Sequence, residues 1–152
     1  MSTPEERLQE LGLSVPDVAK PVAAYIPALR SGQHVFTSGQ LPMRDGSLIL
    51  TGKVGGEVTE EEGVECARQC ALNALAAVRA EVGELSAVKR IVKVVVFVAS
   101  TPDFTAQPKV ANGVSELLGD VFGEAGRHAR SAVGVPVLPL DAPVEVELVV
   151  EI

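Results

Sequence analysis

In the stretch Val144-Glu145-Val146-Glu147-Leu148-Val149-Val150-Glu151-Ile152, apolar residues occupy every second position, and glutamate occupies three of the four positions between them. A period of two is typical of a β-strand, because successive side chains of a strand point to opposite faces of its sheet. Residues 144–152 are therefore predicted to form a strand with one face in the core and one acidic face.

Other strand-like runs supply partners for this strand. Val88–Val98 is dominated by β-branched residues, which is typical of a long strand buried on much of both faces. A further strand is predicted at Ser131–Leu138, and prolines separate it from the strand at 144–152. The turn residues Ser31-Gly32 predict a hairpin. The two strands of that hairpin are predicted at Ala23–Leu29 and His34–Ser38, and a short strand at Leu48–Leu50.

Three segments carry helix signals. Thr59 followed by Glu60–Glu62 predicts a helix start, since acidic side chains complement the positive end of the helix dipole, and Gly83 predicts its end. A second long helix is predicted from Pro102-Asp103-Phe104 to Gly123. A short helix is predicted over residues 3–12 from the capping residues Thr3, Pro4 and Glu6 and the terminator Gly12.

This order of elements predicts an α+β fold of two layers, with two helices packed on one face of a mixed sheet. A chain of 152 residues fits one domain. We expect residues 1–20 to form an N-terminal helix and connector, and residues 21–152 to form the domain itself.

The composition excludes several classes of function. The net charge of -7 disfavours binding to nucleic acid and to anionic membranes. Aromatic residues, at 3%, are too few to build a platform for stacked bases. No apolar run approaches the roughly 20 residues that span a bilayer, and the first residues lack the apolar region of a secretory signal. We therefore expect a cytoplasmic protein.

The two cysteines, Cys66 and Cys70, are four residues apart in the helix predicted from Thr59. This spacing puts both thiols on one face, where a disulfide within an intact helix has poor geometry. A metal site would need further ligands, and the two histidines, His34 and His128, are distant in sequence. We interpret the cysteines as reduced, buried residues and expect no metal.

Arg130 is the most informative charged residue, because it opens an otherwise apolar strand. A guanidinium in such a place needs a partner, and its planar fork matches a carboxylate. One interpretation is an ion pair with Glu145 on a neighbouring strand. The other is a site in which Arg130 binds a substrate carboxylate and Glu145 handles a proton or a water molecule.

The sequence also resembles a known family along most of its length, from about residue 20 to residue 152. The C-terminal motif of the Rid family (reactive intermediate deaminases, also called YjgF) is similar to Arg130–Val135, Leu138-Pro139 and Val144–Glu147. The N-terminal motif of that family resembles Phe36–Pro42, and its central strand and turn resemble Val94–Val98 with Asp103-Phe104.

The resemblance implies a chorismate-mutase-like fold assembled as a homotrimer, with three clefts between subunits. It implies hydrolysis of reactive 2-imino and 2-enamino acids, such as 2-aminoacrylate, to 2-keto acids and ammonia. It implies no cofactor, and a small imino or keto acid as the partner.

Site residues follow from the same resemblance, position by position. Arg130 matches the arginine that binds the substrate carboxylate, and Glu145 matches the glutamate beside the attacking water. Tyr25 matches a cleft tyrosine, although a tyrosine at an interface is an equally simple interpretation. The other substrate-binding positions implied are Ser38, Gly39 and Asn112.

One position departs from the family pattern, since Ala132 stands where some members carry a reactive cysteine. The alternative function is a non-catalytic trimer that binds small carboxylates as a sensor or a chaperone-like protein. An endoribonuclease, a function often attributed to this family, is disfavoured by the negative charge and the few aromatics.

Overall fold

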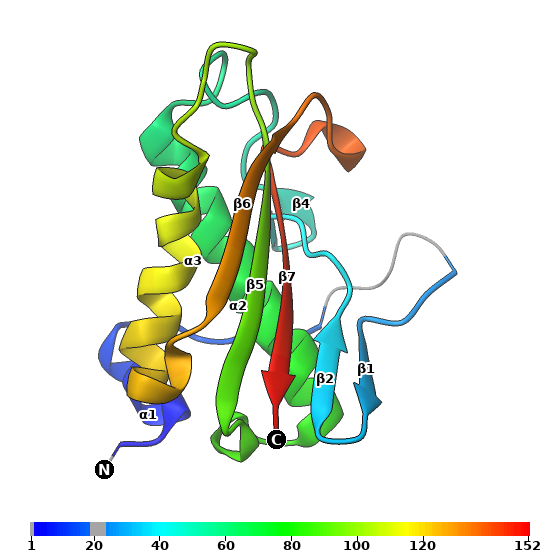
Figure 1. Ribbon diagram of the computed structural model, residues 1–152, viewed down its shortest axis with the longest axis vertical. Helices are drawn as coiled ribbons and strands as arrows, with labels where there is room; N and C mark the ends of the chain where they lie inside the picture. Colours follow the sequence, from blue (N-terminus) through cyan, green and yellow to red (C-terminus); the bar gives the residue numbers. More distant parts are fainter. Residues whose placement is uncertain (1, 19–23) are drawn as a thin grey trace.

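The computed structural model describes residues 2–18 and 24–152, which form a mixed five-stranded sheet with helices on one face (Figure 1). The sheet order is β1-β2-β7-β5-β6; β5 and β6 are parallel, and the other neighbours are antiparallel. The strands of the sheet are β1 (Ala28–Ser31), β2 (His34–Thr37), β5 (Arg90–Ala99), β6 (Ala129–Val135) and β7 (Val144–Glu151), and a separate hairpin consists of β3 (Met43–Arg44) and β4 (Ser47–Leu48).

The C-terminal strand β7 lies in the middle of the sheet, between β2 and β5. Its residues alternate strictly between buried and half-buried, which confirms the predicted two-faced strand. Val144, Val146, Leu148 and Val150 face the helices and are essentially inaccessible to solvent. The glutamates between them therefore lie on the face of the sheet that the helices leave open.

Two long helices cover the other face. The α+β fold with two helices on one face of a mixed sheet is confirmed: α2 (Glu60–Val82) and α3 (Gln107–Phe122) pack against each other and against the strands. Thr59 caps α2 through a reciprocal capping box with Glu62, and Gly83 ends it with a φ of 92°. The predicted bounds of this helix are therefore confirmed.

A third helix, α1 (Pro4–Glu10), lies outside the two layers and packs against α3. The predicted capping box is present, with the Thr3 side chain accepting from Glu6 N while Glu6 Oε2 accepts from Thr3 N. Its single buried residue, Leu8, joins the main core. In the part of the chain that the structure describes, three 3-10 turns complete the fold: η1 (Leu85–Ala87), η2 (Gly123–Gly126) and η3 (Pro139–Asp141).

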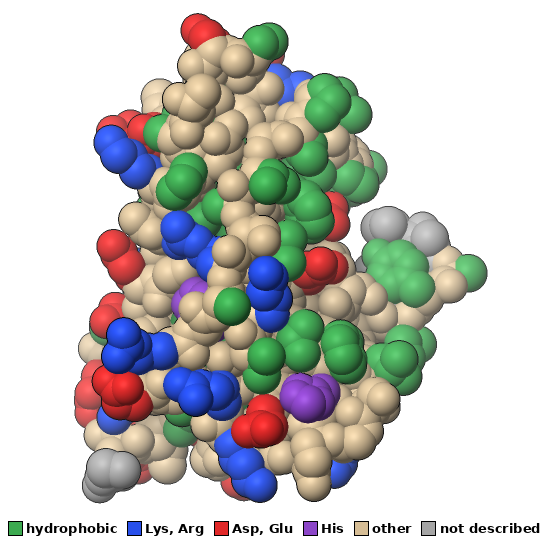
Figure 2. Space-filling model, viewed as in Figure 1, with side chains coloured by type: hydrophobic (Ala, Val, Ile, Leu, Met, Phe, Trp, Pro, Cys, Tyr) green, Lys and Arg blue, Asp and Glu red, His purple; other side chains and the backbone are tan. Residues whose placement is uncertain are grey.

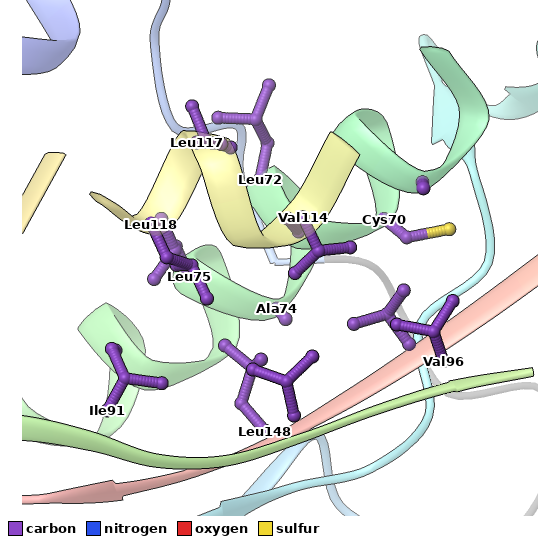
Figure 3. Close-up of a cluster of buried hydrophobic side chains, with 14 of the residues drawn as sticks. Cys70, Leu72, Ala74, Leu75, Ile91, Val96, Val114, Leu117, Leu118 and Leu148 are labelled. Carbon is purple, nitrogen blue, oxygen red and sulfur yellow. The ribbon is translucent and has the colours of Figure 1, made fainter. Parts of the chain in front are cut away.

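The core is the aliphatic layer between the sheet and the two long helices. In Figure 3, side chains from α2 and α3 point down onto residues of the strands, with Leu75, Val114 and Leu118 above Ile91 and Leu148. The layer contains few aromatics, as the composition requires, so it is filled by branched aliphatic side chains and alanine.

Three predicted bounds are corrected by proline positions. The second long helix begins at Gln107 rather than at Pro102–Phe104, because Pro108 is tolerated only in a first turn. The strand predicted to reach Leu138 ends at Val135, since Pro136 has no N–H for the ladder. The first hairpin strand begins at Ala28, directly after Pro27; its predicted first residue, 23, lies outside the described residues.

The short strand predicted at Leu48–Leu50 is also shifted, because it pairs locally rather than in the main sheet. The strand observed here is β4, which pairs with β3 in a separate hairpin. The turn residues of this hairpin, Asp45 and Gly46, both have positive φ, at 53° and 87°. Positive φ at both central residues is the geometry of a tight two-residue hairpin turn. Asp45 and Gly46 are thus a hairpin turn.

The open face of the sheet carries exposed apolar side chains. Leu29, Phe36 and Val133 lie on this face and are between 44% and 56% exposed. Figure 2, which looks onto this face, shows hydrophobic side chains gathered over the strands. Apolar patches of this kind are typical of interaction surfaces.

Close contact between α2 and α3 depends on Gly113. A Cβ at this position would overlap the carbonyl oxygen of Val64 and lie 3.2 Å from the Val64 carbonyl carbon. These are backbone atoms of a packed helix, so they cannot rotate away. We expect Gly113→Ala to destabilise the fold by about 1–3 kcal/mol, as overpacking does. In thermal unfolding, Tm should fall by about 2–4 °C for each kcal/mol.

Gly119 on the same helix provides the matched control. A Cβ there would meet nothing within 4 Å. Gly119→Ala should stabilise the protein by about 0.5–1 kcal/mol through helix propensity alone. Equal Tm shifts for the two variants would show that the contact at Gly113 is not a constraint.

None of the helices in residues 2–18 and 24–152 is both long enough and apolar enough to cross a membrane.

Candidate functional site

Arg130, on edge strand β6, points toward the helix side of the sheet. It is aligned with Val94 of β5, whose side chain is fully buried under the helices. Its Nη1 donates to Asn112 Oδ1 at 2.9 Å and to Ser115 Oγ at 3.1 Å, both on α3. The structure thus brings together Arg130 and Asn112, two of the implied substrate-binding residues.

The two contacts of Arg130 leave one edge of its guanidinium available. Nη1 carries two hydrogens, and each has an acceptor in Asn112 or Ser115. Within residues 2–18 and 24–152, Nε and Nη2 donate to no other group. In a guanidinium, these two nitrogens form one edge of the planar fork, and such an edge can hold a carboxylate through two parallel hydrogen bonds.

Glu145 lies on the open face of the sheet, on strand β7, aligned with Phe97 of β5. Partial burial raises the pKa of its carboxyl above the ordinary value, and the negative charge of Glu147 raises it further. A carboxyl with a raised pKa holds its proton more readily, which suits a group that must take up a proton during a reaction.

The loop after β2 brings Gly39 against Glu145. Strand β2 leaves β7 after Thr37, whose Oγ1 accepts a hydrogen bond from Leu148 N at 2.9 Å. The chain rejoins β7 at Gln40, which exchanges two backbone hydrogen bonds with Val146. The intervening bulge carries Gly39, where a Cβ would overlap Oε2 of Glu145 and lie 2.8 Å from its Cδ.

Ser38, in the same bulge, holds the segment that carries Tyr25. Its hydroxyl donates to the carbonyl of Ile26 at 2.6 Å, and its backbone N–H donates to the carbonyl of Pro27 at 2.8 Å. Tyr25 is 44% exposed and lines a groove of about 750 Å³ that also reaches Gly39. Gly39 thus touches Glu145 and shares the groove with Tyr25, and we call Ser38, Gly39, Tyr25 and Glu145 the Glu145 group.

The Glu145 group and Arg130 are separate within one chain. Strand β5 lies between β6 and β7, so the predicted neighbouring strands are not neighbours. The register places Arg130 level with Leu148, three residues from Glu145, and the two side chains point to opposite faces of the sheet. Two strand spacings of about 4.8 Å and three residues of about 3.3 Å separate their backbones.

The interpretation of Arg130 and Glu145 as an ion pair within one chain is therefore wrong. The prediction failed because sequence order does not reveal that β7 inserts between β2 and β5. Arg130 instead takes its partners from α3, as the contacts with Asn112 and Ser115 show.

Two residues near Arg130 were missed by sequence reasoning. Ser115 bonds to Arg130 and also to His128, with Oγ and Nε2 2.9 Å apart. Their spacing contained the signal: Ser115 is three residues after Asn112 on a helix, and His128 is two residues before Arg130. The first interval places two side chains on the same face of α3, and the second places His128 directly before β6, next to the residue that precedes Arg130.

The cysteines are buried, as expected from their position on α2. Burial raises the pKa of the Cys66 thiol to about 11 and raises that of the Cys70 thiol well above its ordinary value. Both thiols are therefore protonated and unreactive at neutral pH. In the ranges that the structure covers, no group of three or more potential metal ligands is found.

The contact between Gly39 and Glu145 predicts a variant with normal folding and impaired chemistry. Gly39→Ala should change the free energy of unfolding little, because the overlapping atoms belong to the end of a flexible side chain. It should displace the carboxylate of Glu145. If that carboxylate acts on a substrate, as proposed below, a misplacement of about 1 Å can lower turnover about 100-fold. Denaturant unfolding, together with kcat for the proposed reaction, tests this. A large loss of stability, or unchanged turnover, would contradict it.

Comparison with known proteins gives a consistent set of relatives. A family described as "YjgF/chorismate_mutase-like, putative endoribonuclease" matches residues 5–152. Protein TCP17 of Trypanosoma cruzi is 48% identical over 146 residues, covering 95% of this chain and 91% of that protein. A 2-iminobutanoate/2-iminopropanoate deaminase of Dermatophagoides farinae is 31% identical over 140 residues, covering 92% and 94%.

Solved structures agree with the sequence relatives. The crystal structure of a "putative endoribonuclease" from Shewanella oneidensis superposes with a TM-score of 0.97 at 38% identity. The alignment covers 99% of this chain and 100% of that one, so the whole fold is shared.

Proposed function

Because this chain belongs to the YjgF/RutC family of chorismate-mutase-like proteins, we propose that it hydrolyses reactive 2-imino and 2-enamino acids to 2-keto acids. An enamine first tautomerises to its imine. Water adds to the imine carbon, a proton moves to nitrogen, and the C–N bond of the resulting carbinolamine breaks. The products are one 2-keto acid and one ammonia.

The single observation that carries this proposal is the free edge of Arg130. Nε and Nη2 are oriented by the two bonds that Nη1 makes to α3. A small acid would place its carboxylate on this edge, which fixes the adjacent imine carbon relative to the protein. An imine carbon is already electrophilic, so positioning supplies much of what the reaction needs.

Glu145 is the proposed general base. Its carboxylate accepts a proton from the attacking water, and its raised pKa lets it return that proton to the departing nitrogen. Tyr25, in the same group, would hydrogen-bond to the water or to the departing ammonia.

A second copy of the chain is proposed to complete the site, in a homotrimer. Two observations support this: Arg130 and Glu145 lie on opposite faces of one sheet, and the open face carries the exposed residues Leu29, Phe36 and Val133. Packing between copies would bury that apolar surface. The working site would then contain Arg130 of one copy and the Glu145 group of another.

Turnover of 2-aminoacrylate, generated continuously by a separate dehydratase, tests the activity. We expect the wild-type protein to accelerate its conversion to pyruvate and ammonia. Binding of pyruvate without any acceleration would favour the non-catalytic carboxylate-binding trimer and overturn the deaminase. The net charge of -7 disfavours RNA as the substrate.

Mixing two inactive variants tests the shared site. Arg130→Ala and Glu145→Gln chains, unfolded and refolded together in equal amounts, form mixed assemblies. If each site takes Arg130 from one copy and Glu145 from its neighbour, about a quarter of the sites regain both residues. Sites built within single chains would recover no activity, and sedimentation as a stable monomer would exclude the assembly.

A further inference from the structure

Behind Arg130, a line of hydrogen bonds runs from α3 to the 3-10 turn η2. Ser115 Oγ, which accepts from Arg130 Nη1, lies 2.9 Å from His128 Nε2. His128 Nδ1 lies 2.6 Å from the carbonyl oxygen of Gly126. The side chains of Ser115, His128 and Arg130 are partly buried beside a surface hollow of about 340 Å³.

The chemistry of the last acceptor sets the direction of every bond in this line. The Gly126 carbonyl can only accept, so His128 Nδ1 carries a hydrogen and donates it. In the neutral ring Nε2 is then an acceptor, and the Ser115 hydroxyl donates to it. The Ser115 oxygen is left to accept from Arg130, so all donors point away from the guanidinium.

The far end of the line is fixed by backbone packing. A Cβ at Gly126 would overlap the carbonyl oxygen of Leu118 and lie 2.8 Å from its carbonyl carbon, so η2 is pressed directly onto α3. The acceptor for His128 is therefore part of the rigid core. By contrast, Asn112, the other partner of Arg130, is exposed.

We propose that Ser115 and His128 are positioning residues that hold the guanidinium of Arg130 for carboxylate binding. They hold Nη1 against α3 and thereby present the Nε and Nη2 edge to a small 2-imino or 2-oxo acid. This role rests on the proposed function for its ligand.

The affinity of the protein for a small carboxylate shows whether the Arg130 guanidinium is held in place. The probe is 2-oxobutanoate, a stable acid of the product class, titrated by calorimetry into the full-length protein. Ser115→Ala and His128→Leu should each weaken its binding about tenfold, the scale of one hydrogen bond to a charged group. His128→Gln, which keeps an acceptor near the place of Nε2, should restore most of the affinity. Glu116→Ala, an exposed neighbour on α3, should bind as the wild type does.

A readout without ligand separates this proposal from the proposed activity. Long-range ¹H–¹⁵N spectra should show His128 in the Nδ1–H tautomer, with an Nε2 shift that moves in Ser115→Ala. The Arg130 Nε–H signal should be sharp in the wild type and exchange-broadened in Ser115→Ala and His128→Leu.

The possible outcomes distinguish failure of the positioning role from failure of the proposed deaminase activity. If the wild type binds 2-oxobutanoate in a Ser115-dependent way but does not turn over imines, the deaminase fails and the positioning stands. If His128 has the Nε2–H tautomer, or if Ser115→Ala and His128→Leu bind as tightly as the wild type, the positioning is overturned. If the wild type does not bind the probe, the Arg130 signal decides: equal sharpness in all variants overturns the proposal.

Discussion

Arg130→Ala should lower kcat/KM for 2-aminoacrylate by about 100- to 1,000-fold, because two charge-assisted hydrogen bonds to the carboxylate are lost. The fold should be unaffected, since Arg130 is half-buried on an edge strand, Ser115 keeps its hydrogen bond with His128, and Asn112 is exposed to water. Arg130→Lys keeps the charge without the planar fork, and its loss should be smaller, about 10- to 100-fold. Coupled assays of keto-acid formation measure both variants.

Arg127 provides a matched control for this result. It is a nearby arginine on the same segment, highly exposed, with a surface contact to Glu124 at 3.7 Å. Arg127→Ala removes the same charge from the same neighbourhood, so it should leave kcat/KM within about twofold of wild type. Equal losses in Arg127→Ala and Arg130→Ala would indicate a general charge effect and contradict a specific carboxylate contact.

Glu145→Gln should lower kcat by about 100- to 10,000-fold, the usual contribution of a general base. In the wild type, activity should rise with pH as Glu145 loses its proton, with a midpoint above the ordinary glutamate value because burial raises the pKa of this carboxyl. Glutamine has no such titration, so the residual activity of the variant should be flat across that range. A variant that keeps the rise would show that another group is the base.

Although Glu145→Gln should lower kcat, it should not lower the free energy of unfolding at neutral pH. The pKa of Glu145 is raised in the folded protein, so the folded state holds the proton more tightly than the unfolded state. Stability is therefore lost as the pH rises through the folded-state pKa, where the half-buried carboxylate becomes charged. At pH 7, Glu145→Gln should be at least as stable as the wild type, and the difference should shrink below the ordinary glutamate pKa. Thermal unfolding at pH 4 and pH 7 measures this.

Long elements could be predicted from the sequence because their signals are local. The capping box at Thr59 and Glu62 fixes the start of α2, and the alternation over Val144–Glu151 fixes both faces of β7. The start of α3 and the end of β6 are also encoded locally, by Pro108 and Pro136.

The order of strands could not be predicted in the same way, and the candidate site depends on it. Nothing local to Glu145 states that its strand pairs with β5 rather than with β6. Whether Arg130 and Glu145 share a face is a property of strand register, which long-range packing decides. For the same reason the contacts of Arg130 with Asn112 and Ser115 became visible only in the folded arrangement.

The central place of β7 also bears on how the chain folds during synthesis. Strand β7, which follows the other strands in the sequence, lies between the β1–β2 hairpin and the β5–β6 pair. These two parts of the sheet are therefore not connected to each other until β7 has been synthesised. Until then, β2 and β5 each expose an unpaired edge, which is a hazard for aggregation. A nascent chain halted before Val144 should therefore depend on chaperones, whereas a chain that includes β7 can close its sheet in one late step.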